Sequence, residues 1–389
     1  MDFEVTEEQA LFRDSVRRFA ERHLAAGALE RAHRPGFPFD VAREMAAAGL
    51  LGITLPEADG GQGGALMDAV IAIETVALVD PRAADVVQQG NFGAIRTIAE
   101  YASPEQKARL LPALLAGERV IGLGMTEPDA GSAVTDLATR AEPDGEGWRV
   151  SGAKVFTSHS AEAELFLVYV RFGPGVGGIG SVLIERGAEG FEFGAARRYM
   201  NGEEWRPLYL DQVRVGPEDV LLGPGGFRKQ IAGFNAERIG NAARARALGE
   251  CAFEAARAHA LDRTQFGRPL AEFQGLQWKF ADMLTALESA RLLLYRAATR
   301  ADRGLPSAQD AALAKLMCNR AGFEAANEAV QIMGGAGYCE DSLVEYCFRK
   351  TRGWMIAGGS LEMMRNRIAE GIFERRFSQR PPRPREAAE

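Results

Sequence analysis

The sequence has few of the residues that build disulfides, metal sites and nucleic-acid surfaces. Only four cysteines and four histidines occur in 389 residues; no cysteines form a CxxC pair, and the histidines stand far apart. We therefore expect neither a disulfide framework nor a metal site, and the free thiols indicate a cytoplasmic protein. The formal net charge of -7 argues against a nucleic-acid partner, because such proteins usually carry a basic surplus.

Long apolar runs are also missing. The amino terminus, MDFEVTEEQALFRDSVRRFAERH, is acidic and amphipathic, with neither a basic leader nor an apolar stretch long enough to cross a membrane. We therefore expect neither secretion nor a membrane span. Because 47% of the residues are hydrophobic, the chain can form a large core and more than one domain.

Three regions of different patterning predict an α+β fold. Apolar positions recur at helical spacing in residues 1–120, which predicts an N-terminal helical domain. In residues 121–226, β-rich runs such as ELFLVYVRF alternate with turn residues and predict a middle antiparallel β domain. Helical spacing returns in residues 227–377 and predicts a C-terminal four-helix bundle. Residues 378–389 have almost nothing to bury and predict a disordered tail.

Three polar, glycine-punctuated motifs carry the chemical information: MTEPDAGS at residues 125–132, RTQFGRPL at 263–270 and QIMGGAGY at 331–338. In the first, hydroxyl groups bracket a turn where backbone N–H groups can approach a flavin edge or a pyrophosphate. A GxGxxG match at residues 175–180 is followed by SVLIERG, which has the pattern of a strand. We interpret it as a hairpin loop, so the predicted flavin would not use a Rossmann domain.

In wording and in order, these motifs resemble the acyl-CoA dehydrogenase family over nearly the whole chain. The resemblance implies helical, β and helical domains, an FAD cofactor and an acyl-CoA substrate. It also implies an oxidoreductase of acyl-CoA or fatty acid metabolism that acts on CH–CH bonds and passes electrons to an electron-transferring flavoprotein. The family is usually a tetramer built from pairs of subunits, so a homotetramer or dimer is expected.

The resemblance assigns flavin contacts to the middle domain. Met125 and Thr126 would contact the flavin ring, and Ser132 would contact the FAD pyrophosphate and the substrate. In GAKVFTSH, Phe156 would pack beside the flavin and Ser158 would offer its hydroxyl to the N5 edge. A capped turn and an ordinary half-buried strand are the structural alternatives for these two segments.

The other two motifs resemble the family's clamp for the adenine half of FAD, contributed across a subunit interface. Arg263 would supply charge for the pyrophosphate, while Gln265 and Phe266 would shape the nucleotide site. Gln331 and Gly335 match the facing loop, where glycine lets the backbone approach the cofactor. An isolated monomer should therefore bind flavin poorly.

The catalytic base is missing from its usual place. Many family members have a Glu before a GT dipeptide near the carboxyl end, but IAGGSLEMMRN puts Gly358 there. Only its backbone N–H could still contribute, by polarising the thioester oxygen. Ser360 and Glu362 would contact the cofactor. Glu362 is the nearest rival as base, although the family also carries a Glu at that position that is distinct from the base.

A second base position occurs in the long-chain and isovaleryl-type branches, on the first helix of the C-terminal domain. The segment AERIG places Glu237 there, followed by Arg238 as a substrate contact. A small residue at 358 leaves room for this carboxylate, so we take Glu237 as the base that removes the α-proton. Burial should raise its pKa. The alternative is a solvated carboxylate paired with a nearby arginine.

Other functions remain open at this point. The thioester carrier could be an acyl carrier protein, or oxygen could accept the electrons as in an oxidase. The glycine at residue 358 also fits a partner subunit of a heteromeric complex, such as a heterotetramer. The sequence determines neither the acyl group nor the oligomer.

Overall fold

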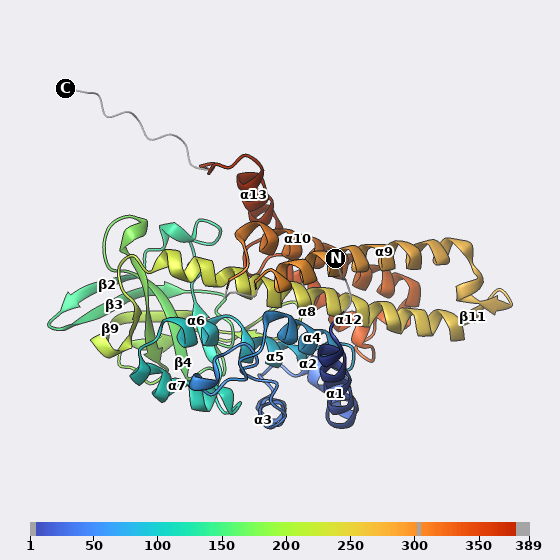
Figure 1. Ribbon diagram of the computed structural model, residues 1–389, viewed down its shortest axis with the longest axis horizontal. Coiled ribbons are helices and arrows are strands. Elements are labelled where there is room, and N and C mark those ends of the chain that lie inside the picture. Colours follow the sequence, from blue (N-terminus) through green and yellow to red (C-terminus); the bar gives the residue numbers. More distant parts are fainter. Residues whose placement is uncertain (1–4, 302–304, 379–389) are drawn as a thin grey trace.

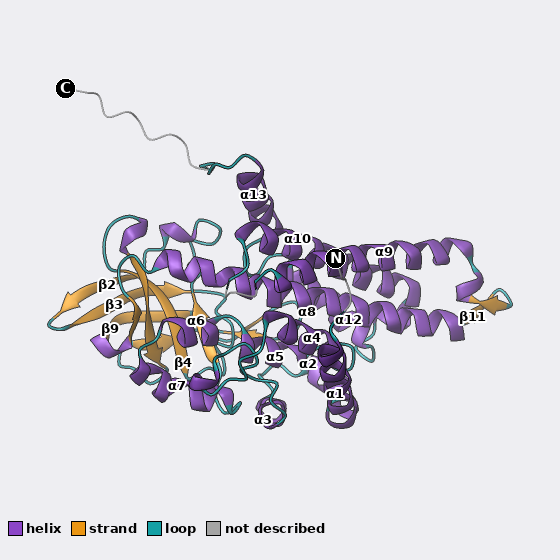
Figure 2. Cartoon of the chain, viewed as in Figure 1, coloured by secondary structure: helices purple, strands orange, loops and turns teal. Residues whose placement is uncertain are grey.

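The computed structural model describes residues 5–301 and 305–378. Helices form the first and last parts of the chain and a sheet forms the middle (Figure 1), which confirms the predicted α+β architecture. Figure 2 shows the sheet gathered at one end of the molecule, while the β11–β12 hairpin stands at the opposite tip. The predicted tail at residues 378–389 lies outside the described residues except for Ser378.

Short helices make up the N-terminal region, and two of them begin at residues that the sequence favours as caps. Thr6 accepts a hydrogen bond from the Gln9 N–H, and Ser103 accepts one from the Gln106 N–H, with Pro104 at the first helical position. The described helices are α1 (Glu7–His23), α2 (Ala28–His33), α3 (Phe39–Ala47), α4 (Leu66–Ala77), α5 (Ala84–Asn91), α6 (Ala94–Tyr101) and α7 (Pro104–Leu115).

The middle region forms a twisted sheet in the order β10-β5-β4-β2-β3-β9-β6. Most pairs are antiparallel as expected, but β1 joins β4 in parallel, with Ile121 opposite Leu165. The GxGxxG match at residues 175–180 lies at the β4–β5 hairpin, as predicted. The strands are β1 (Ile121–Gly124), β2 (Arg140–Asp144), β3 (Gly147–Lys154), β4 (Leu165–Arg171), β5 (Ile179–Glu185), β6 (Phe191–Phe193), β7 (Arg197–Arg198), β8 (Glu204–Trp205), β9 (Leu208–Val215) and β10 (Val220–Leu222).

Long helices form the C-terminal region, in which α8, α9, α10 and the shorter α12 pack as a bundle. Glycine lets α8 and α10 approach closely, because a Cβ at Gly249 would lie 2.5 Å from the Cα of Gly322. The elements are α8 (Phe227–Asp262), β11 (Thr264–Gln265), β12 (Arg268–Pro269), α9 (Gln274–Thr299), α10 (Ala308–Met333), α11 (Gly335–Tyr338), α12 (Leu343–Trp354) and α13 (Leu361–Ile372). Within the described residues, every helix is too short or too polar to cross a bilayer.

Candidate active site

The turn after β1 is held in place by a buried ion pair. Lys154 Nζ lies 2.7 Å from Glu127 Oε1 and donates a 3.3 Å hydrogen bond to the Met125 carbonyl. The Val155 N–H donates to the Thr126 carbonyl at 2.9 Å. These contacts tie the turn to the end of β3, so the two predicted flavin segments lie side by side.

This corner of the sheet fits the ring of FAD. Phe156 has a φ of 56°, and its side chain is 57% exposed and lies beside the Trp205 ring, with 4.6 Å between the ring centroids. Within the described residues, the hydroxyl groups of Thr126, Ser132 and Ser158 have no hydrogen-bond partner in the chain. An exposed aromatic ring among free hydroxyl donors suits a planar, polar-edged heterocycle.

Helix α8 begins against the same corner. Met125 packs into a cluster with Phe227 and Phe234 of α8, so the first turns of this helix face the β1 turn. Glu237 follows Phe234 by about one helical turn. The sequence-predicted base and the predicted flavin contacts are therefore neighbours in the fold.

Glu237 lies in a confined, half-buried position. Gln88 Nε2 of α5 donates a 2.6 Å hydrogen bond to its Oε1. Its Oε2 would lie only 3.1 Å from a Cβ at Gly93, whose φ is 68°. Burial raises the pKa of Glu237 to about 7, although the charges of Arg244 and Lys315 and the bond from Gln88 oppose the rise. A carboxylate with this pKa can accept a proton at neutral pH.

The loop that contains Gly358 lies against Lys315 of α10, whose charge acts on Glu237. Gly358 and Gly359 have φ values of 69° and 93°, and the Gly358 N–H makes no hydrogen bond within the described chain. A Cβ at Gly358 would lie 3.5 Å from Lys315 Cε. Lys315 Nζ donates to the Trp354 carbonyl at 3.0 Å, and burial lowers the pKa of this lysine to about 7. Lys315 therefore links the loop to the neighbourhood of Glu237.

Arg238 also lies close to this loop. Its Nη1 donates to Asn235 Oδ1 at 2.8 Å, and its Nη2 would lie 3.9 Å from a Cβ at Gly359. Burial lowers the pKa of Arg238 to about 10. The side chain is thus close enough to the loop to meet a ligand bound there.

The rival base has a different setting. Glu362 is 76% exposed and pairs with Arg365 at 3.2 Å, while Ser360 caps α13 by accepting a hydrogen bond from the Met363 N–H. A solvated carboxylate paired with arginine is a weak base near pH 7. The structure therefore separates Glu362 from the confined position of Glu237.

The remaining predicted cofactor residues lie at the far end of the bundle. Arg263, Gln265 and Phe266 form the exposed β11–β12 hairpin, and Phe266 is 93% exposed. Gln331 and Gly335 lie at the same end, because α8 and α10 run in parallel. Since 26 residues of helix separate Glu237 from Arg263, their backbones are about 39 Å apart along the axis.

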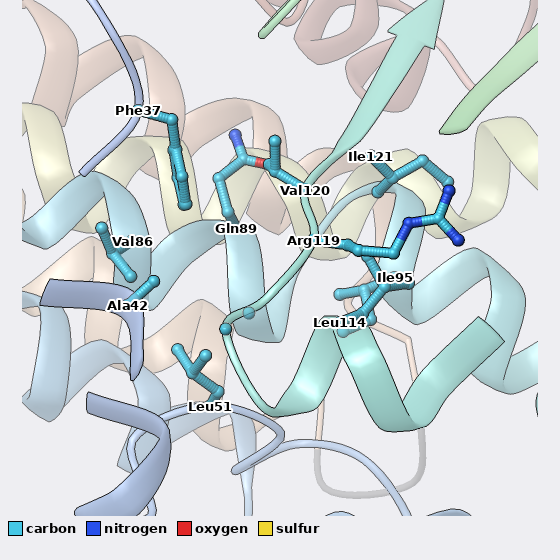
Figure 3. A pocket seen from close by; sticks show the side chains of 12 residues that line it. Phe37, Ala42, Leu51, Val86, Gln89, Ile95, Leu114, Arg119, Val120 and Ile121 are labelled. Atoms are coloured by element: carbon cyan, nitrogen blue, oxygen red, sulfur yellow. The ribbon is translucent and has the colours of Figure 1, made fainter. Parts of the chain in front are cut away.

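A small cavity between α3, α5, α6 and α7 is not part of this site (Figure 3). It is lined by Phe37, Val86 and Ile121 among others, and the space open to the centre of a water molecule is about 20 Å³. Such a volume holds about one water and no acyl chain. Gln88, on another side of α5, contacts Glu237 instead.

Sequence reasoning missed several residues that shape the site: Gln88, Gly93, Lys315 and the pair Glu127–Lys154. A polar residue within the mostly apolar α10 was the available signal for Lys315, whereas α5 is half polar and gave no such signal for Gln88. Nothing in the local sequence distinguishes Gly93 from the other 43 of the 44 glycines.

Comparison with known proteins agrees with this geometry. Three family descriptions match the chain: acyl-CoA dehydrogenase N-terminal domain over residues 6–118, middle domain over 122–213 and C-terminal domain over 224–373. The 3-sulfinopropanoyl-CoA desulfinase of Paraburkholderia xenovorans (strain LB400) is 33% identical, with 97% of this chain and 99% of the relative covered. The short-chain-specific acyl-CoA dehydrogenase of Clostridium acetobutylicum is 34% identical, with 96% and 100% covered.

A solved structure of the complex between glutaryl-coenzyme A dehydrogenase and glutaryl-CoA has a TM-score of 0.92. It shares 29% sequence identity with this chain, and 98% of each chain is covered. Both the sequence matches and this likeness extend through all three domains. The chain therefore belongs to the acyl-CoA dehydrogenase family and is an FAD-dependent oxidoreductase acting on CH–CH bonds.

Proposed function

We propose that the protein dehydrogenates an acyl-CoA thioester between its α- and β-carbons, with Glu237 as the base. The supporting observation is the confinement of this carboxylate by Gln88 and Gly93, which accompanies a pKa raised by burial to about 7. When bound, FAD supplies the hydride acceptor for the β-carbon. Met125, Thr126, Ser132, Phe156 and Ser158 would hold its flavin end.

The α-proton must also be made more acidic. The free N–H of Gly358 could donate to the thioester oxygen and stabilise the negative charge that develops there. The positive charges of Lys315 and Arg238 lie close to the loop and favour the same charge distribution. The loop would thus retain the polarising group while α8 supplies the base.

The adenine half of FAD would be held by a second copy of the chain. Arg263 is about 39 Å along α8 from Glu237, and Gln265, Phe266, Gln331 and Gly335 lie at the same end of the bundle. A same-chain contact with the cofactor is therefore implausible on distance alone, whereas a paired subunit can bring this end to the site. The exposed apolar side chains of Trp278, Leu284 and Leu292 on α9 support a further subunit contact.

The test is anaerobic addition of acyl-CoAs to the purified holoenzyme, followed through the visible flavin spectrum. The panel contains short, branched, long and carboxylate-bearing acyl groups. With the best thioester, Glu237→Gln should retain flavin but bleach it about a thousandfold more slowly, because general base catalysis contributes on that order. Glu254→Gln, an exposed glutamate on the same helix, is the matched control.

Retention of full bleaching by Glu237→Gln, with loss in Glu362→Gln, would reverse the assignment of the base. Flavin that no acyl-CoA bleaches would indicate an acyl carrier protein thioester or a partner-dependent enzyme. Rapid reoxidation of the reduced enzyme by oxygen, with no need for an electron-transferring flavoprotein, would indicate an oxidase.

A further inference from the structure

A polar strip continues from Glu237 into the interior, along the facing sides of α8 and α5. Glu237 and Arg244 are seven residues apart and share one face of α8. On α5, Gln88 donates to Glu237, and Asp85 Oδ1 lies 2.6 Å from Arg244 Nη1. The strip is about 10 Å long. The strip leads away from the proposed flavin site at the turn after β1. That turn packs against α8 at Phe234, which precedes Glu237 in the helix.

The inner end of the strip has an excess of buried positive charge. Arg82 and Lys350 each contact both Asp85 and Glu203, and Arg244 shares the same Asp85. Three cations are therefore grouped around two carboxylates. Their side chains are almost completely buried, so solvent does little to screen the surplus.

Within the described residues of this group, Arg244 has two buried nitrogens without a hydrogen-bond partner, whereas Arg82 has one, its Nε. The Arg244 guanidinium lies 3.7 Å above the Trp354 ring, but its Nε and Nη2 are buried without a hydrogen-bond partner, as is Trp354 Nε1. The contact between Arg244 Nη1 and Asp85 Oδ1 is an ion pair without hydrogen-bond geometry, because Asp85 Oδ1 accepts no hydrogen bond either. Other arginines of the described chain also have an unpaired buried nitrogen, but among them Arg244 alone has two. Unpaired buried donors are unfavourable, and donors of this kind select a ligand with acceptor oxygens.

We infer that the acyl group of the substrate ends in an oxyanion, such as a carboxylate or a sulfinate, which binds Arg244 beside Trp354. The inference rests on the proposed function, because Glu237 fixes where the α-carbon lies. A planar guanidinium with two free N–H groups can bind such a group through a pair of parallel bonds. An apolar chain end would instead leave these donors unpaired, which is unfavourable.

The test compares acyl-CoAs in pairs on the purified holoenzyme. Succinyl-, glutaryl- and adipyl-CoA are each matched with an uncharged acyl-CoA of similar chain size, and 3-sulfinopropanoyl-CoA serves as the sulfinate arm. Binding is measured from the shift of the oxidised flavin spectrum, and turnover from bleaching. We expect the best oxyanion-bearing thioester to bind about tenfold or more tightly than its uncharged match.

Arg244→Met should reduce this preference to about threefold or less, whereas Arg244→Lys should retain part of it. Any effect of Arg244 on the pKa of Glu237 is common to both members of a pair and cancels in the ratio. A wild-type preference for uncharged thioesters, or equal losses for both members in Arg244→Met, would overturn the inference. Tight binding of the oxyanion-bearing thioester without bleaching would support it and reject dehydrogenation instead. Bleaching by uncharged thioesters alone would support dehydrogenation and overturn the inference of an oxyanion.

Discussion

The two ends of α8 carry similar charged side chains in opposite settings. Near its start, Glu237 and Arg244 are enclosed by α5 and by the end of α12 of the same chain. At its far end, Arg263 and Phe266 are exposed on a small hairpin, and Phe266 is 93% exposed. We infer that one chain completes a proton-transfer site but offers only half of a cofactor site.

Mixing two inactive variants would test this comparison most strongly. Glu237→Gln lacks the base, and Arg263→Glu places a negative charge where the FAD pyrophosphate should bind. Each alone should be nearly inactive when assayed without added FAD. If the two ends serve different chains, each hybrid pair has one intact site out of two. Purified hybrids should therefore recover about half of wild-type activity, and the whole co-expressed mixture about a quarter, since about half of all pairs are hybrids.

The matched control for the far end is Arg257→Glu, an exposed arginine near the end of the same helix. This variant should retain FAD. If the mixed variants show no recovery although hybrids form, both ends of α8 serve the same site. Hybrid formation is checked by purification through two different affinity tags, and activity by flavin bleaching per subunit.

Gly93→Ala should disturb the enclosed end alone. The residue has a φ of 68°, and a Cβ would lie 3.1 Å from Glu237 Oε2. Both the backbone strain and the displaced carboxylate should reduce kcat, by about tenfold or more. Gly49→Ala provides the control, because Gly49 has a φ of 72° but no atoms within 4 Å of the added Cβ. Equal losses in both variants would mean that strain alone is responsible.

Lys315→Met should move the pH profile of the enclosed end. The charge of Lys315 lowers the pKa of Glu237, in the same direction as that of Arg244. Its removal should therefore raise the pKa above about 7, so that kcat/KM requires a more alkaline pH to reach its maximum. At pH 7 we expect a loss of several-fold that largely disappears at pH 9.

Lys315→Arg retains the charge and should return the profile toward that of the wild type. The measurement is kcat/KM from pH 5.5 to 9.5, with the flavin content of each variant determined alongside. An unshifted acidic limb in Lys315→Met would show that this lysine supports the Trp354 carbonyl without acting on the base.

Local sequence patterns predicted the parts of the fold that depend on residues close together in the sequence. Thr6 and Ser103 cap helices as their spacing indicates, and strand-like residues after the GxGxxG match exclude the Rossmann interpretation. The parallel pairing of β1 with β4 could not be predicted in this way, because its partners are 44 residues apart, as in Ile121 and Leu165. Pairing at that distance depends on the packing of the whole sheet.

The site shows the same division. Glu237 could be proposed from a motif, but its contacts with Gln88 and Gly93 come from other helices. Arg244 stands seven residues after Glu237, at helical spacing, but this pattern alone does not predict that its side chain is buried. A solvated face has the same pattern, and only the packing of α5 against α8 distinguishes a buried arginine from an exposed one.

The smallest expected effect concerns stability at the enclosed end. In the unfolded chain Glu237 should ionise near its ordinary value of 4.5, whereas burial raises its folded pKa to about 7. Unfolding between these values therefore releases a proton, and the folded state loses stability as pH rises through that interval.

Glu237→Gln has no charge to bury, so its Tm should exceed that of the wild type by a few degrees at pH 8 and by less at pH 5. Thermal scans of the flavin-saturated proteins measure the difference. A Tm difference that is constant with pH would mean that the carboxylate is not confined enough to serve as the proposed base, since the same burial underlies both properties.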